Sequence, residues 1–306
     1  MSPTSQILPV LSDELAGAVQ RAASLVVAVH ADSRLSSSGV IWRDGVVITA
    51  AHTVRREEDI EITFPEGSRG RASLAGFDAG TDLAVLRADS ARSSTLQRSE
   101  TGTLKVGQLA IAVARLGEQG VNASLGMIGG LGGAWRTWRG GRIEQLIRVA
   151  ITLYPGFSGG ALLDAHGAVI GINTAGLARS GGVALPHSTV DRVAGELLTK
   201  GYIARPHLGV AAQSVRLPGS LRDKLGLDRG TGVIVVGLDP DGPAERAGVF
   251  VGDILLSVDA QPVGDTMDLQ HALVGLIGRT LPVTLVRGGE PLTLQVVPGE
   301  RPHRAR

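Results

Sequence analysis

The chain contains no cysteine, and this absence removes several kinds of chemistry at once. Disulfide frameworks, zinc sites built on cysteine and catalysis by a thiolate are all excluded. The seven histidines include no pair at the i, i+4 spacing with which a helix presents two metal ligands. We therefore expect no metal site in this protein.

An excess of charge of one sign is also lacking. The 30 lysines and arginines nearly balance the 29 aspartates and glutamates, which argues against a broad basic face for nucleic acid or an anionic membrane. A Trp/Arg cluster at 135–139 is more typical of a loop stabilised by its own aromatic rings. The glycine run at 129–133 lacks the third glycine and the lysine of nucleotide-binding loops. We expect no nucleic-acid partner and no cofactor.

Long apolar runs are missing too. No stretch approaches the ~18 consecutive apolar residues of a transmembrane helix, so no membrane span is expected. No basic residue precedes Arg21, and the apolar run Leu25–Val29 is shorter than the ~7–15-residue core of a signal peptide. As written, the sequence predicts a cytoplasmic protein. A periplasmic protein with a trimmed N-terminus would have the same sequence features.

Glycine, in contrast, is abundant, at 43 of 306 residues. Together with 14 prolines it stays below the ~25–30% that is typical of disordered chains, so the glycines are expected to mark turns in a folded protein. Short β-rich runs between these turns favour a barrel or sandwich. Ten strands are predicted in two sets: Leu25–Val29, Gly39–Trp42, Val46–Thr49, Ile60–Phe64 and Leu83–Arg87, then Leu109–Ala114, Leu125–Gly129, Gln145–Ile151, Gly160–Leu163 and Val169–Asn173.

Changes in composition divide the chain into four segments. These are residues 1–24, an N-terminal segment with a short amphipathic helix over 12–24; residues 25–204, two β-units with a Ser/Thr-rich connector near 90–103; residues 205–299, a separate module of alternating strands and helices; and residues 300–306, a disordered tail.

Three short motifs carry the residue types of a nucleophilic hydrolase. A serine hydroxyl attacks only when a base takes its proton, and an imidazole that does so needs a carboxylate to fix its tautomer and stabilise its cation. His52, Asp82 and Ser158 supply these groups. The spacing puts His52 and Asp82 on the first β-unit and Ser158 on the second. The site is therefore expected in the cleft between the two units.

The glycines around Ser158 have a mechanical use. An oxyanion hole needs unobstructed backbone N–H groups that point to one place, and Gly156 and Ser158 can provide such a pair. Gly159 and Gly160 let the chain approach substrate and a neighbouring strand closely.

In this order, the motifs resemble those of the HtrA/Deg serine proteases. The similarity includes Thr-Ala-Ala-His at 49–52, Asp-Leu-Ala-Val-Leu at 82–86 and Pro-Gly-x-Ser-Gly-Gly-x-Leu at 155–162. It covers roughly residues 12–298. The resemblance implies a mainly β fold, a trypsin-like double β-barrel followed by an α+β PDZ domain, and a serine endopeptidase that acts on unfolded or misfolded polypeptides.

The resemblance also implies the role of each residue. His52 would be the general base, Asp82 the group that orients it and Ser158 the nucleophile, with the amides of Gly156 and Ser158 as oxyanion donors. Phe157 stands where the family usually has asparagine. This substitution leaves a second function open, a catalytically impaired peptide-binding scaffold or chaperone in which Phe157 jams the activation loop.

The substrate pocket is predicted around four residues. Six residues before the nucleophile, where trypsin-like enzymes carry an acid at the base of the pocket, this chain has Thr152. Asn173, Thr174 and Ala175 complete the predicted pocket. No buried carboxylate is evident to pair with lysine or arginine, so cleavage is expected after small or medium aliphatic residues.

The C-terminal module resembles the PDZ domain of the family. His207, Leu208, Gly209 and Val210 fit the loop whose N–H groups capture the carboxylate of a peptide C-terminus, while the peptide adds as a strand. The helix predicted over Met267–Leu276 would form the far wall of the groove. Peptide binding is expected to tether substrate or to raise activity, with the loop at Phe157 as the element that switches.

Assembly is inferred from the resemblance alone. Members of the family usually form homotrimers through N-terminal aromatic residues. Residues 1–24 of this chain contain no Phe, Trp or Tyr. A homotrimer is nevertheless the assembly that the resemblance implies.

Overall fold

The computed structural model describes residues 4–32, 36–92, 97–177 and 181–301. The chain divides into two compact units, Met1–Ile203 and Ala204–Arg306. Parts of the predicted connector near 90–103 and most of the predicted tail at 300–306 lie outside the described residues. Within the described ranges, every helix is too short or too polar to traverse a bilayer.

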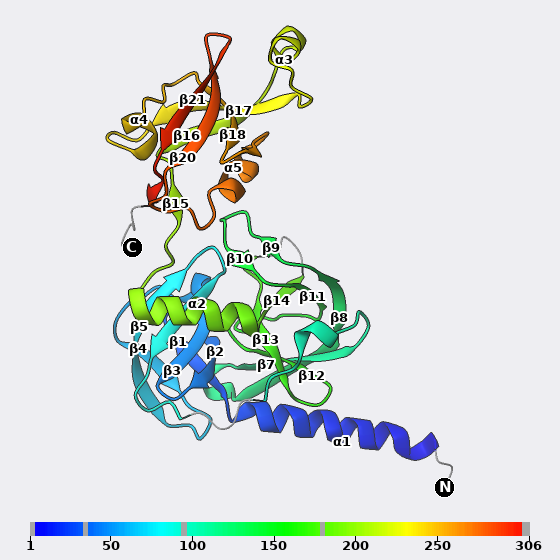
Figure 1. The fold of residues 1–306 in the computed structure, drawn as a ribbon. Coiled ribbons are helices and arrows are strands. Elements are labelled where there is room, and N and C mark those ends of the chain that lie inside the picture. The colour runs from blue at the N-terminus through cyan, green and yellow to red at the C-terminus, as the bar shows by residue number, and fades with distance from the viewer. Residues whose placement is uncertain (1–3, 33–35, 93–96, 178–180, 302–306) are drawn as a thin grey trace. The chain divides into compact units, whose positions relative to one another are not determined.

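A closed six-stranded barrel forms the first half of the first unit (Figure 1). Its strands are rich in Val and Ile, whose branched side chains pack well on a pleated surface. Pairing of the first strand with the fourth closes the sheet and leaves no free edge. The strands, in order round the barrel, are β1 (Val26–His30), β2 (Ser37–Arg43), β3 (Val46–Ala50), β6 (Leu83–Arg87), β5 (Arg69–Asp78) and β4 (Ile60–Thr63).

The second half of this unit is a second closed barrel of six strands. Two successive barrels confirm the predicted mainly β, double-barrel fold. The strands, in barrel order, are β11 (Leu146–Ala150), β14 (Gly182–Pro186), β13 (Val169–Thr174), β12 (Ala161–Asp164), β7 (Leu109–Arg115) and β8 (Val121–Gly132). The connections hold a small hairpin of β9 (Trp135–Arg136) and β10 (Arg142–Ile143), and the 3-10 helices η1 (Ala51–Thr53), η2 (Thr101–Thr103) and η3 (Gly117–Gln119).

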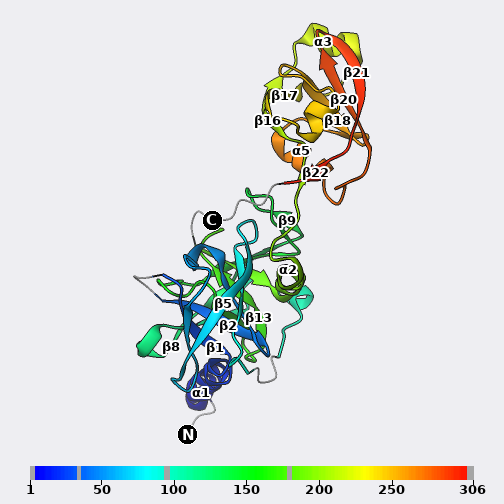
Figure 2. The same ribbon diagram turned by 90° about the vertical axis from the view of Figure 1, so that its left-hand side faces the viewer.

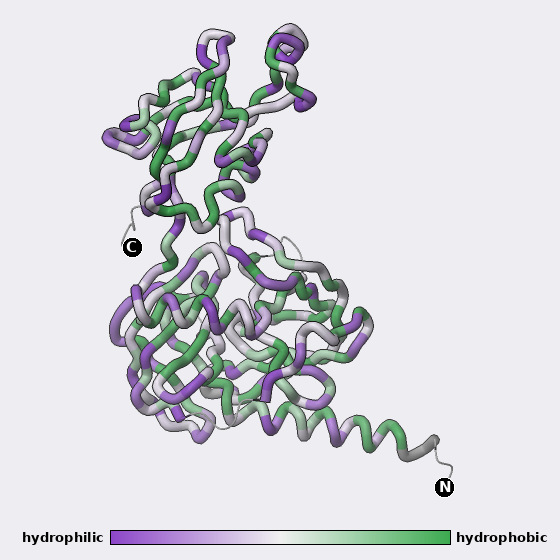
Figure 3. Tube along the Cα trace, viewed as in Figure 1, coloured by the Kyte–Doolittle hydropathy of each residue, from purple (hydrophilic) through white to green (hydrophobic). Residues whose placement is uncertain are grey.

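The N-terminal helix α1 (Thr4–Ala23) is longer than the helix predicted over 12–24. It runs through Pro9, although a proline lacks the N–H group of a helical hydrogen bond and favours a helix end. Its C-terminal half packs on the barrels through the buried Ala18 and Ala22. Figure 3 shows that its N-terminal half is apolar as well. The exposed apolar side chains there are Ile7, Leu8, Val10 and Leu11.

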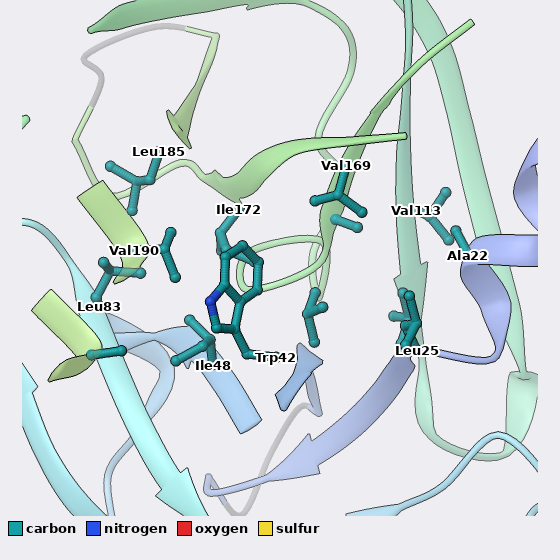
Figure 4. Close-up of a cluster of buried hydrophobic side chains, with 14 of the residues drawn as sticks. Ala22, Leu25, Trp42, Ile48, Leu83, Val113, Val169, Ile172, Leu185 and Val190 are labelled. Carbon is teal, nitrogen blue, oxygen red and sulfur yellow. The ribbon is translucent and has the colours of Figure 1, made fainter. Parts of the chain in front are cut away.

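One buried apolar cluster joins both barrels to helix α2 (His187–Lys200). In Figure 4 the ring of Trp42, from the first barrel, lies beside Ile172 of the second barrel and near Val190 of α2. The indole N–H of Trp42 also donates a hydrogen bond of 2.7 Å to the carboxylate of Asp191. Because protein interiors are close-packed and resist deformation, this shared core holds residues from the two barrels at a constant separation.

The second unit is an antiparallel sheet with short helices (Figure 2). The sheet runs in the order β16 (Val210–Arg216), β17 (Thr231–Leu238), β18 (Ile254–Val258), β20 (Leu281–Arg287) and β21 (Glu290–Val296), with β19 (Gln261–Pro262) paired to β18. A separate pair is formed by β15 (Pro206–His207) and β22 (Gly299–Glu300), and the helices are α3 (Gly219–Leu225), α4 (Pro243–Arg246) and α5 (Thr266–Ala272).

A buried carboxylate ties together three parts of the second unit. Asp253 is 1% exposed and accepts hydrogen bonds from the guanidinium of Arg287, at 2.8 and 2.9 Å, and from the backbone N–H of Phe250, at 2.8 Å. Burial raises the pKa of this carboxyl, but the hydrogen bonds lower it by more, so the pKa of Asp253 lies below its ordinary value. The ionised form therefore stabilises the folded state.

Asp253→Asn is expected to lower the free energy of unfolding of the second unit by about 2–4 kcal/mol at pH 7, because it leaves the Arg287 guanidinium without its anion. A carboxyl with a depressed folded pKa stabilises the fold above its unfolded pKa, and this contribution is lost as the pH falls through the folded pKa. The difference between the variant and the wild type should shrink below about pH 4. Urea unfolding of the full chain measures this difference in the free energy of unfolding. Hydrogen exchange at the backbone amides of β17 and β18 reports on the second unit. A difference that is independent of pH would contradict this account.

Candidate active site

His52 and Asp82 form a doubly hydrogen-bonded pair at the end of the first barrel. His52 lies in η1, directly after β3, and Asp82 directly precedes β6. The ring Nδ1 of His52 is 2.7 Å from Oδ2 of Asp82, and its backbone N–H donates to Oδ1 at 2.9 Å. The Asp82 side chain is 3% exposed, whereas that of His52 is 37% exposed. The carboxylate thus orients the imidazole from the buried side and leaves Nε2 toward the open side.

A second aspartate shapes the turn that carries Asp82. The carboxylate of Asp78 accepts hydrogen bonds from the backbone of Gly80, at 3.1 Å, and from the N–H and hydroxyl of Thr81, at 2.9 and 2.8 Å. Asp82 itself has a φ of 57°, in the left-handed region that few residues other than glycine adopt. The hydroxyl of Thr137, in the β9–β10 hairpin, donates to the carbonyl of Gly80 at 2.7 Å. The first barrel and the β9–β10 hairpin, which connects two strands of the second barrel, therefore both hold this turn.

Thr174, at the end of β13, donates its hydroxyl to Oδ2 of Asp82. Its hydroxyl oxygen accepts from the backbone N–H of Gly176 at 2.9 Å. The sequence predicts Thr174 in the substrate pocket, but its side chain is fully buried and supports Asp82. No local motif signals this role, because 92 positions separate the two residues in the sequence.

Ser158 lies in the loop between β11 and β12 and is 7% exposed. Its Oγ accepts a hydrogen bond of 3.2 Å from the N–H of Ala175. The next residue, Gly176, packs so closely on the histidine–aspartate pair that an added Cβ would lie 2.7 Å from Nδ1 of His52 and 2.6 Å from Oδ2 of Asp82. The segment Ala175–Gly176 therefore contacts all three residues and brings them to one place.

The described residues show no hydrogen bond between His52 and Ser158. Such bonds are often long in the free enzyme and shorten in the substrate complex.

Gly159 packs against the strand that leads to His52, since an added Cβ would lie 2.0 Å from the carbonyl oxygen of Ser38 and 2.5 Å from the hydroxyl oxygen of Thr49. Only glycine fits between the serine loop and the first barrel.

The residues before Ser158 form a type II turn. Pro155 and Gly156 are its central residues, Gly156 has a φ of 90°, and the N–H of Phe157 donates to the carbonyl of Tyr154 at 3.0 Å. The N–H groups of Phe157, Gly159 and Gly160 are all hydrogen-bonded. Among the described residues, those of Gly156 and Ser158 have no partner. The turn thus leaves two free donors beside the serine, as an oxyanion hole requires.

The four residues of the predicted pocket lie in different surroundings. Thr152 and Ala175 are exposed. Asn173 is fully buried, and its amide nitrogen donates to the carbonyl of Ala161 at 2.7 Å. Asn173 and Thr174 are therefore part of the barrel interior and do not line an open pocket, because both side chains are fully buried. Among the described residues, the amide oxygen of Asn173 has no hydrogen-bond partner.

The predicted peptide-binding loop lies at the start of the second unit's sheet. Nε2 of His207 is 2.7 Å from the carboxylate of Asp239, Leu208 is buried in the core of the unit, and Gly209 has a φ of 75°. Val210 begins β16, which is the outer strand of the sheet, and α5 packs beside β16. An outer strand next to a helix offers the free edge to which a peptide adds as a strand.

The helix α5 ends earlier than predicted. It covers Thr266–Ala272, where the sequence predicts a helix over Met267–Leu276. The carboxylate of Asp265 caps its start by accepting from two backbone N–H groups, at 2.8 Å each.

In the part of the chain that the structure describes, no group of three or more His, Asp or Glu residues could hold a metal ion.

Comparison with known proteins assigns both units. Residues 37–172 match the model of the trypsin-like peptidase domain, and residues 206–297 match that of the PDZ domain. Two solved structures are similar over nearly their whole length. The HtrA-type protease AlgW, solved with a decapeptide, is 27% identical with a TM-score of 0.75 and covers 95% of this chain and 99% of its own. The serine endoprotease from Yersinia pestis is 28% identical with a TM-score of 0.74, covering 94% and 98%.

Curated relatives carry related names. A probable periplasmic serine endoprotease DegP-like from Halomonas elongata is 35% identical over 285 residues, which are 89% of this chain and 58% of the relative. A putative serine protease HhoB from Synechocystis is 31% identical over 278 residues, 87% of this chain and 66% of the relative. This chain therefore spans little more than half the length of the first of these relatives.

One sequence prediction is wrong. The relatives from Halomonas elongata and Pseudomonas putida are named periplasmic, which contradicts the predicted cytoplasmic location. The prediction rested on the lack of a signal-peptide pattern near Arg21 and Leu25–Val29, and the folded domains themselves do not record the compartment. The two domain matches, the relatives and the solved structures agree on the remaining identification: the chain belongs to the HtrA/Deg family of serine proteases, which join a trypsin-like peptidase domain to a PDZ domain.

Proposed function

We propose that this protein is a serine endopeptidase in which Ser158 is the nucleophile, His52 the general base and Asp82 the residue that orients His52. The observation that carries the proposal is the convergence on one point of the His52–Asp82 pair, the Ser158 hydroxyl and two backbone N–H groups that have no partner among the described residues. The match to the trypsin-like peptidase domain supports it.

The geometry leads to a two-step mechanism. Ser158 Oγ attacks the carbonyl carbon of the scissile peptide bond while Nε2 of His52 takes its proton. The N–H groups of Gly156 and Ser158 stabilise the oxyanion that forms, and His52 then gives the proton to the leaving amine. An acyl-enzyme on Ser158 remains. Water, deprotonated by His52, attacks the acyl carbonyl, and the proton returns to Ser158 as the ester bond breaks.

Asp82 and Thr174 act on His52 in this mechanism. The carboxylate of Asp82 accepts from Nδ1 of His52 and so leaves Nε2 free to act as the base. It also stabilises the imidazolium that forms during the reaction. The hydroxyl of Thr174 keeps Oδ2 of Asp82 in place. Thr174 is thus proposed as a positioning residue.

We propose segments of unfolded or misfolded polypeptides as substrates, cleaved after small or medium aliphatic residues. Neither segment beside Ser158, 149–158 or 173–177, contains an aspartate or glutamate that could attract lysine or arginine. Apolar side chains pack there instead, since a Cβ on Gly182 would lie 2.4 Å from Leu153 and 3.0 Å from Val149.

An active-site-directed fluorophosphonate tests the proposed activity. The wild type should be labelled on Ser158, and the label should be absent from Ser158→Ala. Ser73→Ala, which removes an exposed serine on β5, is the matched control and should be labelled like the wild type. A wild type that stays unlabelled would favour the alternative function, a peptide-binding scaffold or chaperone without catalysis.

We further propose that the loop His207–Val210 binds peptide C-termini in the groove between β16 and α5. A solved relative with a bound decapeptide and the PDZ match support this proposal. A decapeptide that ends in Leu-Val with a free carboxylate should bind at least about tenfold more tightly than the same peptide with a C-terminal amide, because hydrogen bonds to a charged group are the stronger ones. Fluorescence anisotropy measures both. Equal affinities would show that the loop does not read the carboxylate.

A periplasmic location and a homotrimer complete the proposal. The location is supported by the names of the relatives. The trimer is supported by membership of the family alone, and light scattering at micromolar protein concentration checks it.

A further inference from the structure

Phe157, between the two proposed oxyanion donors, is the residue in which this chain departs from the family's usual asparagine. Its side chain is 2% exposed and belongs to the buried core of the second barrel, together with Ile128, Ile147 and Leu162. The ring also makes an edge-to-face contact with Tyr154, with 5.7 Å between centroids. A ring held in the barrel core cannot block the cleft. The structure thus disagrees with the alternative in which Phe157 jams the loop.

The backbone N–H and carbonyl groups of Phe157 are both hydrogen-bonded within the loop. The N–H of Phe157 donates to Tyr154, and its carbonyl accepts from the N–H of Gly160 at 3.1 Å. In a trans peptide the N–H and C=O groups point in opposite directions. The bond from Gly160 therefore also sets the direction of the free N–H of Ser158, while the type II turn sets that of Gly156.

The first barrel adds a clamp on the same loop. The hydroxyl of Ser38 donates to the carbonyl of Gly156 at 2.7 Å, and its backbone N–H donates to the carbonyl of Ser158 at 3.2 Å. The hydroxyl oxygen of Ser38 accepts from the N–H of Arg115 at 3.0 Å. Ser38 is fully buried, so water does not compete for these bonds. The loop is fixed to one barrel by the Phe157 ring and to the other by Ser38.

We propose that Phe157 is a positioning residue that keeps the oxyanion turn formed without a peptide at the PDZ domain. A rearrangement of the turn that displaces residue 157 must withdraw an apolar ring from the barrel core, which burial disfavours. Peptide binding then tethers substrate and leaves the rate of the chemical step unchanged. Of the two effects that the sequence predicts for peptide binding, tethering of substrate and a rise in activity, only tethering then remains, and this inference rests on the proposed function.

The first test compares the wild type with and without a peptide. The full-length protein is labelled with a fluorophosphonate, alone and with a saturating amount of the decapeptide that ends in Leu-Val. Fluorescence anisotropy confirms that this peptide is bound. The two labelling rates should agree within about twofold, since a peptide that does not distinguish two states of the turn cannot shift them. A rate that rises tenfold or more with peptide would overturn the proposal and leave the proposed enzyme intact. Labelling under neither condition would overturn both.

The second test separates positioning from stability. Phe157→Ala should lower kcat on a small chromogenic substrate by about 10- to 100-fold with little change in KM, because a displaced oxyanion donor costs less than the about 10²- to 10³-fold of a removed one. Ile128→Ala removes apolar volume from the same core away from the turn, and it should keep kcat within about threefold at a comparable loss in Tm. Phe157→Leu, which fills most of the space, should restore most of kcat. If kcat of Phe157→Ala and Ile128→Ala fall equally, the role of Phe157 is only structural. If Phe157→Ala does not fold, Phe157→Val takes its place: a loss of kcat larger than that of Ile128→Ala at a comparable Tm supports the proposal, and equal losses contradict it.

Discussion

Ser158→Ala and His52→Ala are each expected to lower the turnover of a casein substrate by about 10⁴- to 10⁶-fold. The reason is that the nucleophile and its base act as one unit, so that removal of either leaves only substrate binding and the oxyanion donors. For the same reason, the double variant should be little slower than either single variant. Release of soluble peptides, measured over days at high enzyme concentration, covers this range.

Two control variants show whether the loss is chemical. His166→Ala and Ser73→Ala change exposed residues of the same types on the second and first barrels, and both should keep wild-type turnover. The Tm of Ser158→Ala should match that of the wild type, since its small hydroxyl makes one hydrogen bond of 3.2 Å. Degradation of casein by Ser158→Ala at a tenth of the wild-type rate or more would refute the assigned nucleophile.

Asp82→Asn is expected to lower kcat by about 10³- to 10⁴-fold, the second largest effect. The carboxylate accepts from both the backbone N–H and Nδ1 of His52, and it also accepts from the hydroxyl of Thr174. An amide has only one acceptor oxygen, and its NH₂ group would face a donor or hold His52 in the wrong tautomer. The imidazole would then lose its ability to accept the proton of Ser158.

Thr174→Val is expected to lower kcat less than Asp82→Asn does, and it serves as the comparison for that variant. It keeps the shape of the side chain and removes one hydrogen bond to a charged group, so kcat should fall by about tenfold. Both variants should retain KM within a few-fold, because neither residue lies where substrate binds. Turnover of a chromogenic peptide between pH 5 and pH 9 measures both. A larger loss in Thr174→Val than in Asp82→Asn would contradict the proposed order of roles.

Several elements of the fold could be read from the sequence, and two strands could not. Val- and Ile-rich runs predict five strands in each barrel, but each barrel has six. The strand β5 contains Gly70 and Gly76 and several exposed side chains, and β14 is a short run that ends in Pro186. Glycine and proline disfavour strands in isolation, and only pairing with neighbours on both sides offsets that preference.

The sequence by itself determined the residue types and the order of the candidate site. The catalytic candidates can be recognised from the sequence because each belongs to a short motif with a local backbone requirement. They are His52, Asp82, Ser158 and the glycines around the serine. The tertiary structure alone decided which distant groups complete the site. Thr174 reaches Asp82, Ser38 clamps the serine loop and Phe157 enters the barrel core, and each of these contacts joins residues from different elements. The physical reason is that hydrogen bonds and burial depend on distance in space, which a one-dimensional pattern does not record once strands from two barrels fold together.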